Sequence, residues 1–521
     1  MKRRDFCKAA ALLAAGALVP HADAAQPDTV QAIVGSAAAE DRYTVNFRSD
    51  LSEADLPCSF YYTDAFFEQS ALEYHHPLAQ ATLCLAVCGG STWQSEQRYW
   101  MQGEVGREDS IEAAYRQLGF ANTHYVGYDR SLNEMVDTAG CAFAQKTLVH
   151  GGRRTTLVAA MLRGFGYGNE WASNLHVGAG GGHVAFISAA EQFFADLQSY
   201  LALAKKQAGT LGTVKLWIGG YSRGAAAANL AAAKIRRELP EIAPENTFVY
   251  TFATPAAITV ADHPELQADF AHNRTADGTL RPDWEPSNIF NIISSGDLVA
   301  RVLPQEWGYR RNGNDRFLPS TAYQNELDDL NILDSRIGGV PLHFEQLATK
   351  EDVDSVIAAG LRFCGSIQNY HEKYEQPFTD MLRCAFIRSE AEVTQGVVLD
   401  DEAVLERLRS LPNIRQMAWS KVLRCVLAAS TMSRPLLEKL GSAVPPQAQQ
   451  VVIPVLAVGL CYEVETDVLK LLVYYIISLM SVKSPADSVL RAAYCHFPEN
   501  YFALMQYYDP AEHGMEAYTR K

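Results

Sequence analysis

Features typical of nucleic-acid-binding and membrane-spanning proteins are missing from this sequence. The 521 residues carry 45 Lys and Arg against 60 Asp and Glu, a net charge of −15, and no basic stripe offsets this acidic balance. An acidic surface repels phosphate backbones, so we expect no nucleic-acid partner. The most apolar stretch, residues 451–479, is interrupted by Glu463, Glu465, Asp467 and Lys470. These charges make it too polar for a membrane-spanning helix.

Recognisable metal and nucleotide motifs are also absent. Cys84 and Cys88 lack a second Cys or His pair at zinc-ligand spacing. Most of the ten cysteines lie in apolar surroundings, which is typical of small buried hydrophobic residues. The glycine-rich loops 164–168 and 178–182 lack the Lys-Ser/Thr of a P-loop and the spacing of a dinucleotide fingerprint. We therefore expect the chemistry to need neither a metal nor an organic cofactor.

Residues 1–24 have the organisation of an export signal. The string Arg3-Arg4-Asp5-Phe6-Cys7-Lys8 precedes an apolar stretch, 9–19, that is too short for a stable membrane anchor. Ala22-Asp23-Ala24 offers the small residues that a signal peptidase reads. The string resembles a twin-arginine signal, which implies export after folding. We expect an exported mature chain, periplasmic or extracellular, without a transmembrane anchor; the alternative is a basic, disordered N-terminus.

The strongest functional signal is a glycine-flanked serine, Ser222. An apolar run at 214–218 predicts a strand, and the alanine-rich run 225–234 predicts a helix that stops at Pro240. Glycines two residues before and after the serine permit a sharp strand-to-helix turn, where side chains would force the two elements apart. Such a turn presents the serine Oγ above the carboxyl edge of a sheet. The alternative is that Ser222 only caps the helix.

Strands and helices alternate along the rest of the chain. Apolar strands are expected at 155–162, 247–253 and 289–293, and helices at 78–86, 111–118 and 185–207. Continuous apolar strands separated by helices predict a parallel sheet covered on both faces, with the active site beyond the carboxyl ends of the strands. Residues 25–54 are expected to form a loosely ordered lead-in. Residues 345–490 predict a helical lobe, either a second packed layer or a cap over Ser222, and both can hold.

A nucleophilic serine needs a base, and the base needs an acid that fixes its tautomer. Asp297 directly follows the strand at 289–293 and is the candidate acid, although a turn or surface ion pair would also explain it. On hydrolase sheets of this kind the base follows the acid in the chain. The histidines downstream of Asp297 are His343, His371, His496 and His513. We favour His496, because Pro498 suits the first position of a helix and places His496 on the loop before it; His371 and His343 are the alternatives.

Several motifs together resemble those of bacterial class 3 lipases, a branch of the α/β-hydrolases. The matching runs are residues 162–164, 170–174, 182–186, 252–255, 297–304 and 496–501. The resemblance implies an α/β-hydrolase fold with a mostly parallel central sheet, helices on both faces and a large helical cap. The core would span 25–344 and the C-terminal segment 491–521 would return to it, with 345–490 as the cap or insertion.

The resemblance also implies a reaction. Ser222, His496 and Asp297 would form a triad that cleaves carboxylic esters through an acyl-enzyme, with lipid or acylglycerol esters as substrates and transient contact with a lipid surface. Backbone N–H groups of Arg223 and Phe165 would form the oxyanion hole. Phe165 stands where the family commonly has Thr or Ser, Ala185 replaces the usual glycine, and Gly166 is the alternative second donor. His183 would be structural.

Two other functions remain open at this point. The same triad serves thioesterases, amidases and acyltransferases. A non-catalytic binding protein could also keep the fold.

Overall fold

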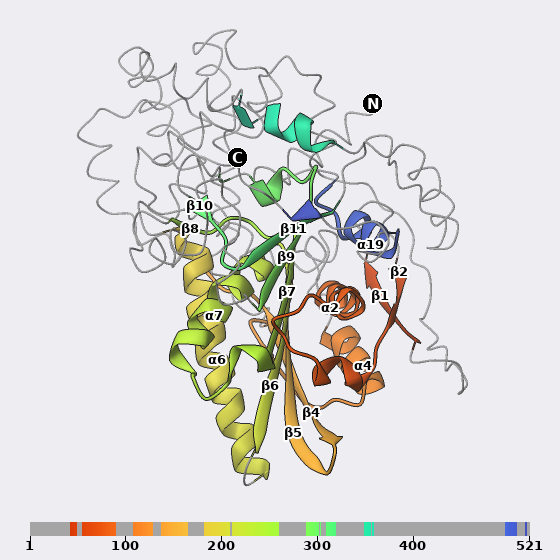
Figure 1. Cartoon of the computed structure of the whole chain (residues 1–521), viewed down its shortest axis with the longest axis vertical. Coiled ribbons are helices and arrows are strands. Elements are labelled where there is room, and N and C mark those ends of the chain that lie inside the picture. Colours follow the sequence, from red (N-terminus) through yellow and green to blue (C-terminus); the bar gives the residue numbers. More distant parts are fainter. Residues whose placement is uncertain are drawn as a thin grey trace, which may run out of the picture.

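A mixed eight-stranded sheet lies at the centre of the described part of the chain (Figure 1). The computed structural model describes residues 42–48, 55–89, 108–128, 137–164, 182–208, 211–259, 288–301, 303, 309–318, 348–355, 357–358, 495–507 and 516–517. The predicted signal at 1–24 and most of the predicted lobe at 345–490 lie outside these residues. No helix within the described ranges is long and apolar enough to cross a membrane.

The strand order in the sheet is β12-β11-β9-β7-β6-β5-β4-β3. Five consecutive strands are parallel: β5 (Arg153–Leu162), β6 (Thr213–Tyr221), β7 (Thr247–Phe252), β9 (Ile289–Ser294) and β11 (Asn314–Leu318). Antiparallel strands complete both edges: β3 (Ala121–Val126) and β4 (Cys141–His150) on one side, and β12 (Glu516–Ala517) on the other. The predicted mostly parallel sheet is confirmed, whereas β3, β4, β11 and β12 were not anticipated.

Helices cover both faces of this sheet, as the apolar strands require. Helices α6 (Val184–Ala208) and α7 (Arg223–Glu238) pack on one face, and α2 (His76–Cys88) and α4 (Glu108–Gln117) on the other (Figure 1). Every residue of β7 and β9 is buried as a result. The helices predicted at 185–207, 78–86 and 111–118 correspond to α6, α2 and α4.

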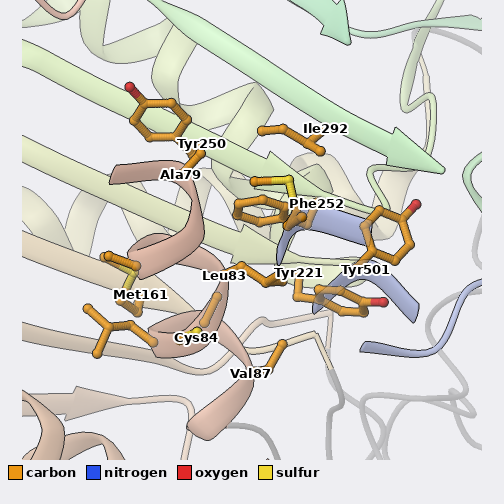
Figure 2. Close-up of a cluster of buried hydrophobic side chains, with 14 of the residues drawn as sticks. Ala79, Leu83, Cys84, Val87, Met161, Tyr221, Tyr250, Phe252, Ile292 and Tyr501 are labelled. Atoms are coloured by element: carbon orange, nitrogen blue, oxygen red, sulfur yellow. The ribbon is translucent and has the colours of Figure 1, made fainter. Parts of the chain in front are cut away.

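Side chains of β6 alternate between the two apolar layers, as the period of a strand dictates. Leu216 and Ile218 belong to the layer under α6 and α7, whereas Trp217 packs towards α2 and donates from its indole Nε1 to Thr82 Oγ1 at 2.8 Å. Figure 2 shows Leu83 and Cys84 of α2 lying against Tyr221 and neighbouring side chains of the sheet. The strand that leads to Ser222 is therefore held from both faces.

The expected loose lead-in at 25–54 is wrong for its last part. β1 (Arg42–Arg48) pairs antiparallel with β2 (Asp55–Tyr61), with Arg42 opposite Tyr61. Val45 and Phe47 are buried, and Thr44 and Asn46, which alternate with them along the strand, are exposed. This alternation of period two is the signal that the sequence reading missed, because it covers only a few residues.

The remaining described elements are short and lie mostly near the carboxyl ends of the strands. They are η1 (Asp64–Glu68), η3 (Pro244–Asn246), β8 (Ile258–Thr259), η4 (Val299–Arg301), β10 (Tyr309–Arg310) and α19 (Pro498–Tyr507). Helix α19 lies beside α2, where His76 Nε2 and Gln80 Nε2 donate to the carbonyl of Met505 at 2.9 and 2.6 Å. The segment 498–507 thus returns to α2, more than 400 positions earlier in the sequence.

Few residues of the predicted lobe at 345–490 are described. Residues 350–355 are helical, and Ala348, Val353 and Ile357 are buried in the same apolar cluster as α2. Asp354 pairs with Arg301 of η4. The start of this region therefore packs on the core, and a cap over Ser222 stays a prediction.

Burial of the described cysteines leads to a test by chemical labelling. Cys58, Cys84, Cys88, Cys141 and Cys495 are all buried. Burial raises the pKa of the Cys58 and Cys141 thiols well above the ordinary value, so these thiols hold almost no reactive thiolate at neutral pH. We expect iodoacetamide to modify none of the five in the native protein and all five in guanidinium chloride, as peptide mapping by mass spectrometry would measure. Native labelling of any of them would contradict this packing.

Candidate active site

Ser222 occupies the single-residue turn between β6 and α7. Its φ of 49° and ψ of −117° lie in a region that a residue with a side chain rarely adopts, at a cost of on the order of 1–3 kcal/mol. A Cβ on Gly220 would lie 2.5 Å from the carbonyl of Gly224, and one on Gly224 would lie 2.5 Å from the carbonyl of Arg163. Neither clash can be relieved by a side-chain movement. The two glycines therefore let strand, helix and the β5 end approach closely, as predicted.

Backbone hydrogen bonds hold the strained turn in place. The N–H of Ser222 donates to the carbonyl of Phe252, the last residue of β7, at 2.9 Å, and the N–H of Ala226 donates to the carbonyl of Ser222 at 3.0 Å. Although Ser222 stands at the N-cap position, its side chain makes no capping hydrogen bond. Its Oγ instead lies 2.8 Å from Nε2 of His496. The alternative that Ser222 caps α7 is wrong.

His496 lies between Ser222 and Asp297. Its Nδ1 is 2.9 Å from Asp297 Oδ2, and both side chains are buried. An ionised carboxylate only accepts hydrogen bonds, so this contact assigns the ring proton to Nδ1 and leaves Nε2 to accept from the serine hydroxyl. The carbonyl of His496 accepts a hydrogen bond from Tyr221 OH at 2.6 Å. Ring and backbone of His496 are thus both oriented.

Asp297 is fully buried, and four donors surround its carboxylate. Oδ1 accepts from the N–H groups of Val299 and Ala300 in η4, at 2.9 and 3.2 Å. Oδ2 accepts from His496 Nδ1 and from Tyr501 OH, the latter at 2.7 Å. Since a buried charge without partners is very unfavourable, these donors are what allow a carboxylate at this position. Asp297 lies just beyond β9, as predicted.

Tyr501 is a member of the site that sequence reasoning did not single out. Its hydroxyl accepts from the N–H of Ser294, at the end of β9, at 2.9 Å while donating to Asp297. Burial, with the Asp297 charge adding to it, raises the pKa of Tyr501 well above the ordinary value, so the phenol stays protonated and remains a donor.

Tyr221 is the second member that was missed. Its ring meets that of Tyr501 edge-on, with centroids 5.6 Å apart, and Figure 2 shows the two from β6 and α19. Tyr501 closes the run 496–501 quoted for the resemblance, and Tyr221 precedes the serine. Position next to a motif was the only signal available for either residue.

Two buried arginines lie near the carboxyl ends of β5 and β6. The Nε of Arg223 donates to the carbonyl of Thr138 at 2.6 Å, and Nη2 of Arg163 donates to the carbonyl of Gly127 at 2.7 Å. Arg223 is the first residue of α7, so its backbone N–H lies at the positive end of that helix. Phe165 lies outside the described residues, and so do Gly166, His343, His371 and His513. The second oxyanion donor therefore remains a prediction.

His183 has a local structural role. Its Nδ1 accepts from the N–H of Phe186 at 3.4 Å, and its backbone N–H donates to the carbonyl of Ala257 at 2.8 Å. Its ring also stacks on Phe186 at the start of α6. Among the residues that the structure describes, no group of three or more His, Cys, Asp or Glu side chains could hold a metal ion.

The family model of class 3 lipases, "Lipase (class 3)", matches residues 158–307 of this chain. The matched segment contains β6, β7 and β9 with Ser222 and Asp297, and it ends before His496. The predicted resemblance to class 3 lipases is confirmed for this segment. No curated protein sequence matches the chain.

Solved structures of lipases are among those similar to the chain. One is a triacylglycerol lipase whose catalytic centre is formed by a serine protease triad, with 16% identity, coverage of 47% of this chain and 80% of that one, and a TM-score of 0.30. Another is the Rhizomucor miehei triacylglyceride lipase, with 14% identity, coverage of 49% of this chain and 82% of that one, and a TM-score of 0.29. A third is lipase II from Rhizopus niveus, with 14% identity, coverage of 53% and 83%, and a TM-score of 0.28. The strand order of the sheet and the family match over residues 158–307 place the described core in the α/β-hydrolase fold.

The bonds of Tyr501 lead to a prediction about stability. Tyr501→Phe keeps the ring but removes the donor to a buried carboxylate, so we expect the free energy of unfolding to fall by about 1.5–3 kcal/mol. Tyr250→Phe is the matched control, because among the described residues that buried hydroxyl takes part in a single hydrogen bond, accepting from the N–H of His75 at 3.3 Å. This change should cost about 0.5–1.5 kcal/mol. Urea unfolding followed by tryptophan fluorescence measures both. A smaller loss for Tyr501→Phe than for Tyr250→Phe would contradict a charge-assisted bond.

Proposed function

We propose that this chain, which matches class 3 lipases over residues 158–307, is a serine hydrolase that cleaves carboxylic esters. One observation carries the proposal: Ser222 Oγ lies 2.8 Å from His496 Nε2, and His496 Nδ1 lies 2.9 Å from Asp297 Oδ2. A hydroxyl, an imidazole and a carboxylate linked in this order can activate the oxygen as a nucleophile. Lipid esters such as acylglycerols are the substrate class that the family match supports.

The reaction follows from the direction of these hydrogen bonds. Ser222 Oγ attacks the ester carbonyl while its proton passes to His496 Nε2, and Asp297 stabilises the resulting imidazolium. His496 then gives the proton to the leaving alcohol, and an acyl-enzyme remains on Ser222. His496 then takes a proton from a water that attacks the acyl group, and it returns this proton to Ser222 Oγ as the carboxylic acid leaves, which restores the triad.

The negative charge on the tetrahedral intermediate needs donors beside Ser222. The backbone N–H of Arg223 at the start of α7 is one proposed donor, since the helix N-terminus adds positive potential there. The N–H of Phe165 is the other, with Gly166 as its alternative. Losing one such donor typically costs on the order of a hundredfold in rate.

The proposed setting of this activity is outside the cytoplasm. Residues 1–24 would direct export through a twin-arginine-type signal, and residues 345–490 would form a helical cap over the site.

Thioester or amide hydrolysis and acyl transfer use the same nucleophile and base, so product analysis with esters, thioesters and amides distinguishes them. Failure of the mature protein to react with any fluorophosphonate would favour a non-catalytic binding protein.

The nucleophile is tested by Ser222→Ala. We expect this variant to lose fluorophosphonate labelling and to hydrolyse p-nitrophenyl butyrate at least about a thousandfold more slowly, because it removes the oxygen that lies against His496 Nε2. Ser199→Ala is the control, since Ser199 lies on the exposed side of α6 and its Oγ donates to the carbonyl of Ala195 in the same helix. A Ser222→Ala variant that still labels at a serine would place the site elsewhere.

The base is tested by ranking three histidine variants. His496→Ala should be about as damaging as Ser222→Ala, because the proton of the hydroxyl then has no acceptor. His371→Ala and His343→Ala should leave kcat within about threefold of the wild type, as expected for changes away from the triad. Steady-state kinetics on the same ester measures all three. If His371→Ala or His343→Ala were the more damaging change, the base would be reassigned.

A further inference from the structure

We propose that Arg311 is a positioning residue for this reaction, which fixes the turn that holds Asp297. The inference rests on the proposed function, because it assigns Arg311 a role in keeping the acid against His496. Arg311 is buried between β10 and β11, and it touches neither Ser222 nor His496 through any hydrogen bond found among the described residues.

The guanidinium of Arg311 uses three nitrogens in separate directions. Nε and Nη2 donate to the two carboxylate oxygens of Asp315 on β11, at 3.1 and 3.0 Å. Nη1 donates to the carbonyls of Ala300 and Thr254, at 2.8 and 3.0 Å. The bidentate contact with Asp315 fixes the plane of the guanidinium, and this plane sets where Nη1 points.

The two carbonyls held by Nη1 belong to the loops that build the active site. Ala300 is in η4, and its own N–H, with that of Val299, donates to Asp297 Oδ1. Thr254 follows β7 by two residues, and the carbonyl of Phe252 at the end of β7 accepts from the N–H of Ser222. Arg311 therefore joins the turn that carries the acid to the loop that supports the nucleophile.

The anchor of Arg311 is itself tied to the sheet. Asp315 Oδ1 also accepts from Nδ2 of Asn291 in β9 at 2.9 Å, and Asn291 Oδ1 accepts from Nδ2 of Asn229 in α7 at 2.8 Å. The network thus reaches from β11 through β9 to the helix that begins at Ser222. Buried networks in which the members are hydrogen-bonded keep a single arrangement, because each lost bond leaves a polar group without water.

A different role for the same contacts is stability alone. Removing one partner of a buried ion pair destabilises a fold, because the other charge is left uncompensated. The two roles have different consequences. If Arg311 positions the acid, loosening it changes the hydrogen bond between His496 Nδ1–H and Asp297 in the folded protein. If Arg311 only stabilises, that bond is unchanged as long as the protein is folded.

The experiment uses Arg311→Lys in the full chain with ¹⁵N-labelled histidine. Lysine keeps the charge but cannot bind Asp315 with two nitrogens and also reach Ala300. We expect the downfield proton resonance of His496 Nδ1–H, assigned by its loss in His496→Gln, to move upfield or disappear. With p-nitrophenyl butyrate, we expect kcat to fall roughly ten- to a hundredfold while KM stays within about twofold, because misplacement by about 1 Å acts on the chemical step.

Arg316→Lys is the matched control. Arg316 is the next residue along β11 after Asp315, so it faces the other side of the sheet, with its guanidinium 4.7 Å from the ring centre of Tyr74 and 5.6 Å from that of Phe290. The Arg316→Lys variant makes the same chemical change in a partly buried arginine, but the side chain that it alters has no hydrogen bond to η4 among the described residues. The His496 resonance and kcat should both stay as in the wild type.

An unchanged Nδ1–H resonance and an unchanged kcat in folded Arg311→Lys would overturn the proposal. If that variant does not fold, Asp315→Asn carries the test, because it keeps the volume and one acceptor but releases the second nitrogen of Arg311. We then expect a smaller change in the His496 Nδ1–H resonance and a smaller fall in kcat. The resonance is measured without substrate. A wild-type protein that hydrolysed no ester would therefore refute the proposed function, while the spectra would still decide the role of Arg311.

Discussion

The buried carboxylate of Asp297 is the constraint on which the site depends. A charge without access to water must be met by donors, and here they come from η4, His496 and Tyr501. These donors are contributed by η4, which follows β9 in the chain, and by the C-terminal segment. The same four bonds that make the charge tolerable also bring the imidazole into line with Ser222 and join α19 to the sheet. The hydrogen bonds that replace water around the Asp297 carboxylate are thus the same ones that assemble the site.

The strained turn at Ser222 depends on the packing around it. Its positive φ persists because β6 is held between two apolar layers and because Gly220 and Gly224 leave no side chain to separate strand from helix. Trp217, whose indole donates a hydrogen bond to Thr82, fixes β6 five residues before Ser222. A serine in this conformation has its Oγ directed away from the helix N–H groups that it would otherwise cap. The strained backbone of Ser222 therefore fixes the direction in which its hydroxyl points.

Sequence patterns predicted what local sterics and strand ends determine. Ser222 was found from its glycines, Asp297 from the strand before it, and His496 from Pro498. The hairpin of β1 and β2 and the antiparallel β3 and β4 were missed, because short or weakly alternating strands acquire their order from partners. Tyr221, Tyr501 and Arg311 were missed for a related reason. Tyr501 meets Asp297 across 204 positions of sequence, and no local pattern encodes such a contact.

The separation between acid and base has a consequence for how this fold can vary. Asp297 and His496 are 199 positions apart, yet their side chains are in contact. The entropy of closing a loop grows only with the logarithm of its length, so doubling the intervening chain costs roughly 0.6 kcal/mol. Both ends are pinned by the packing of α19 on α2 and by Tyr501 on Asp297. Evolution could change the length of this stretch outside its packed residues 309–318, 348–355 and 357 at little thermodynamic cost, provided that these residues and the two anchor points keep their places.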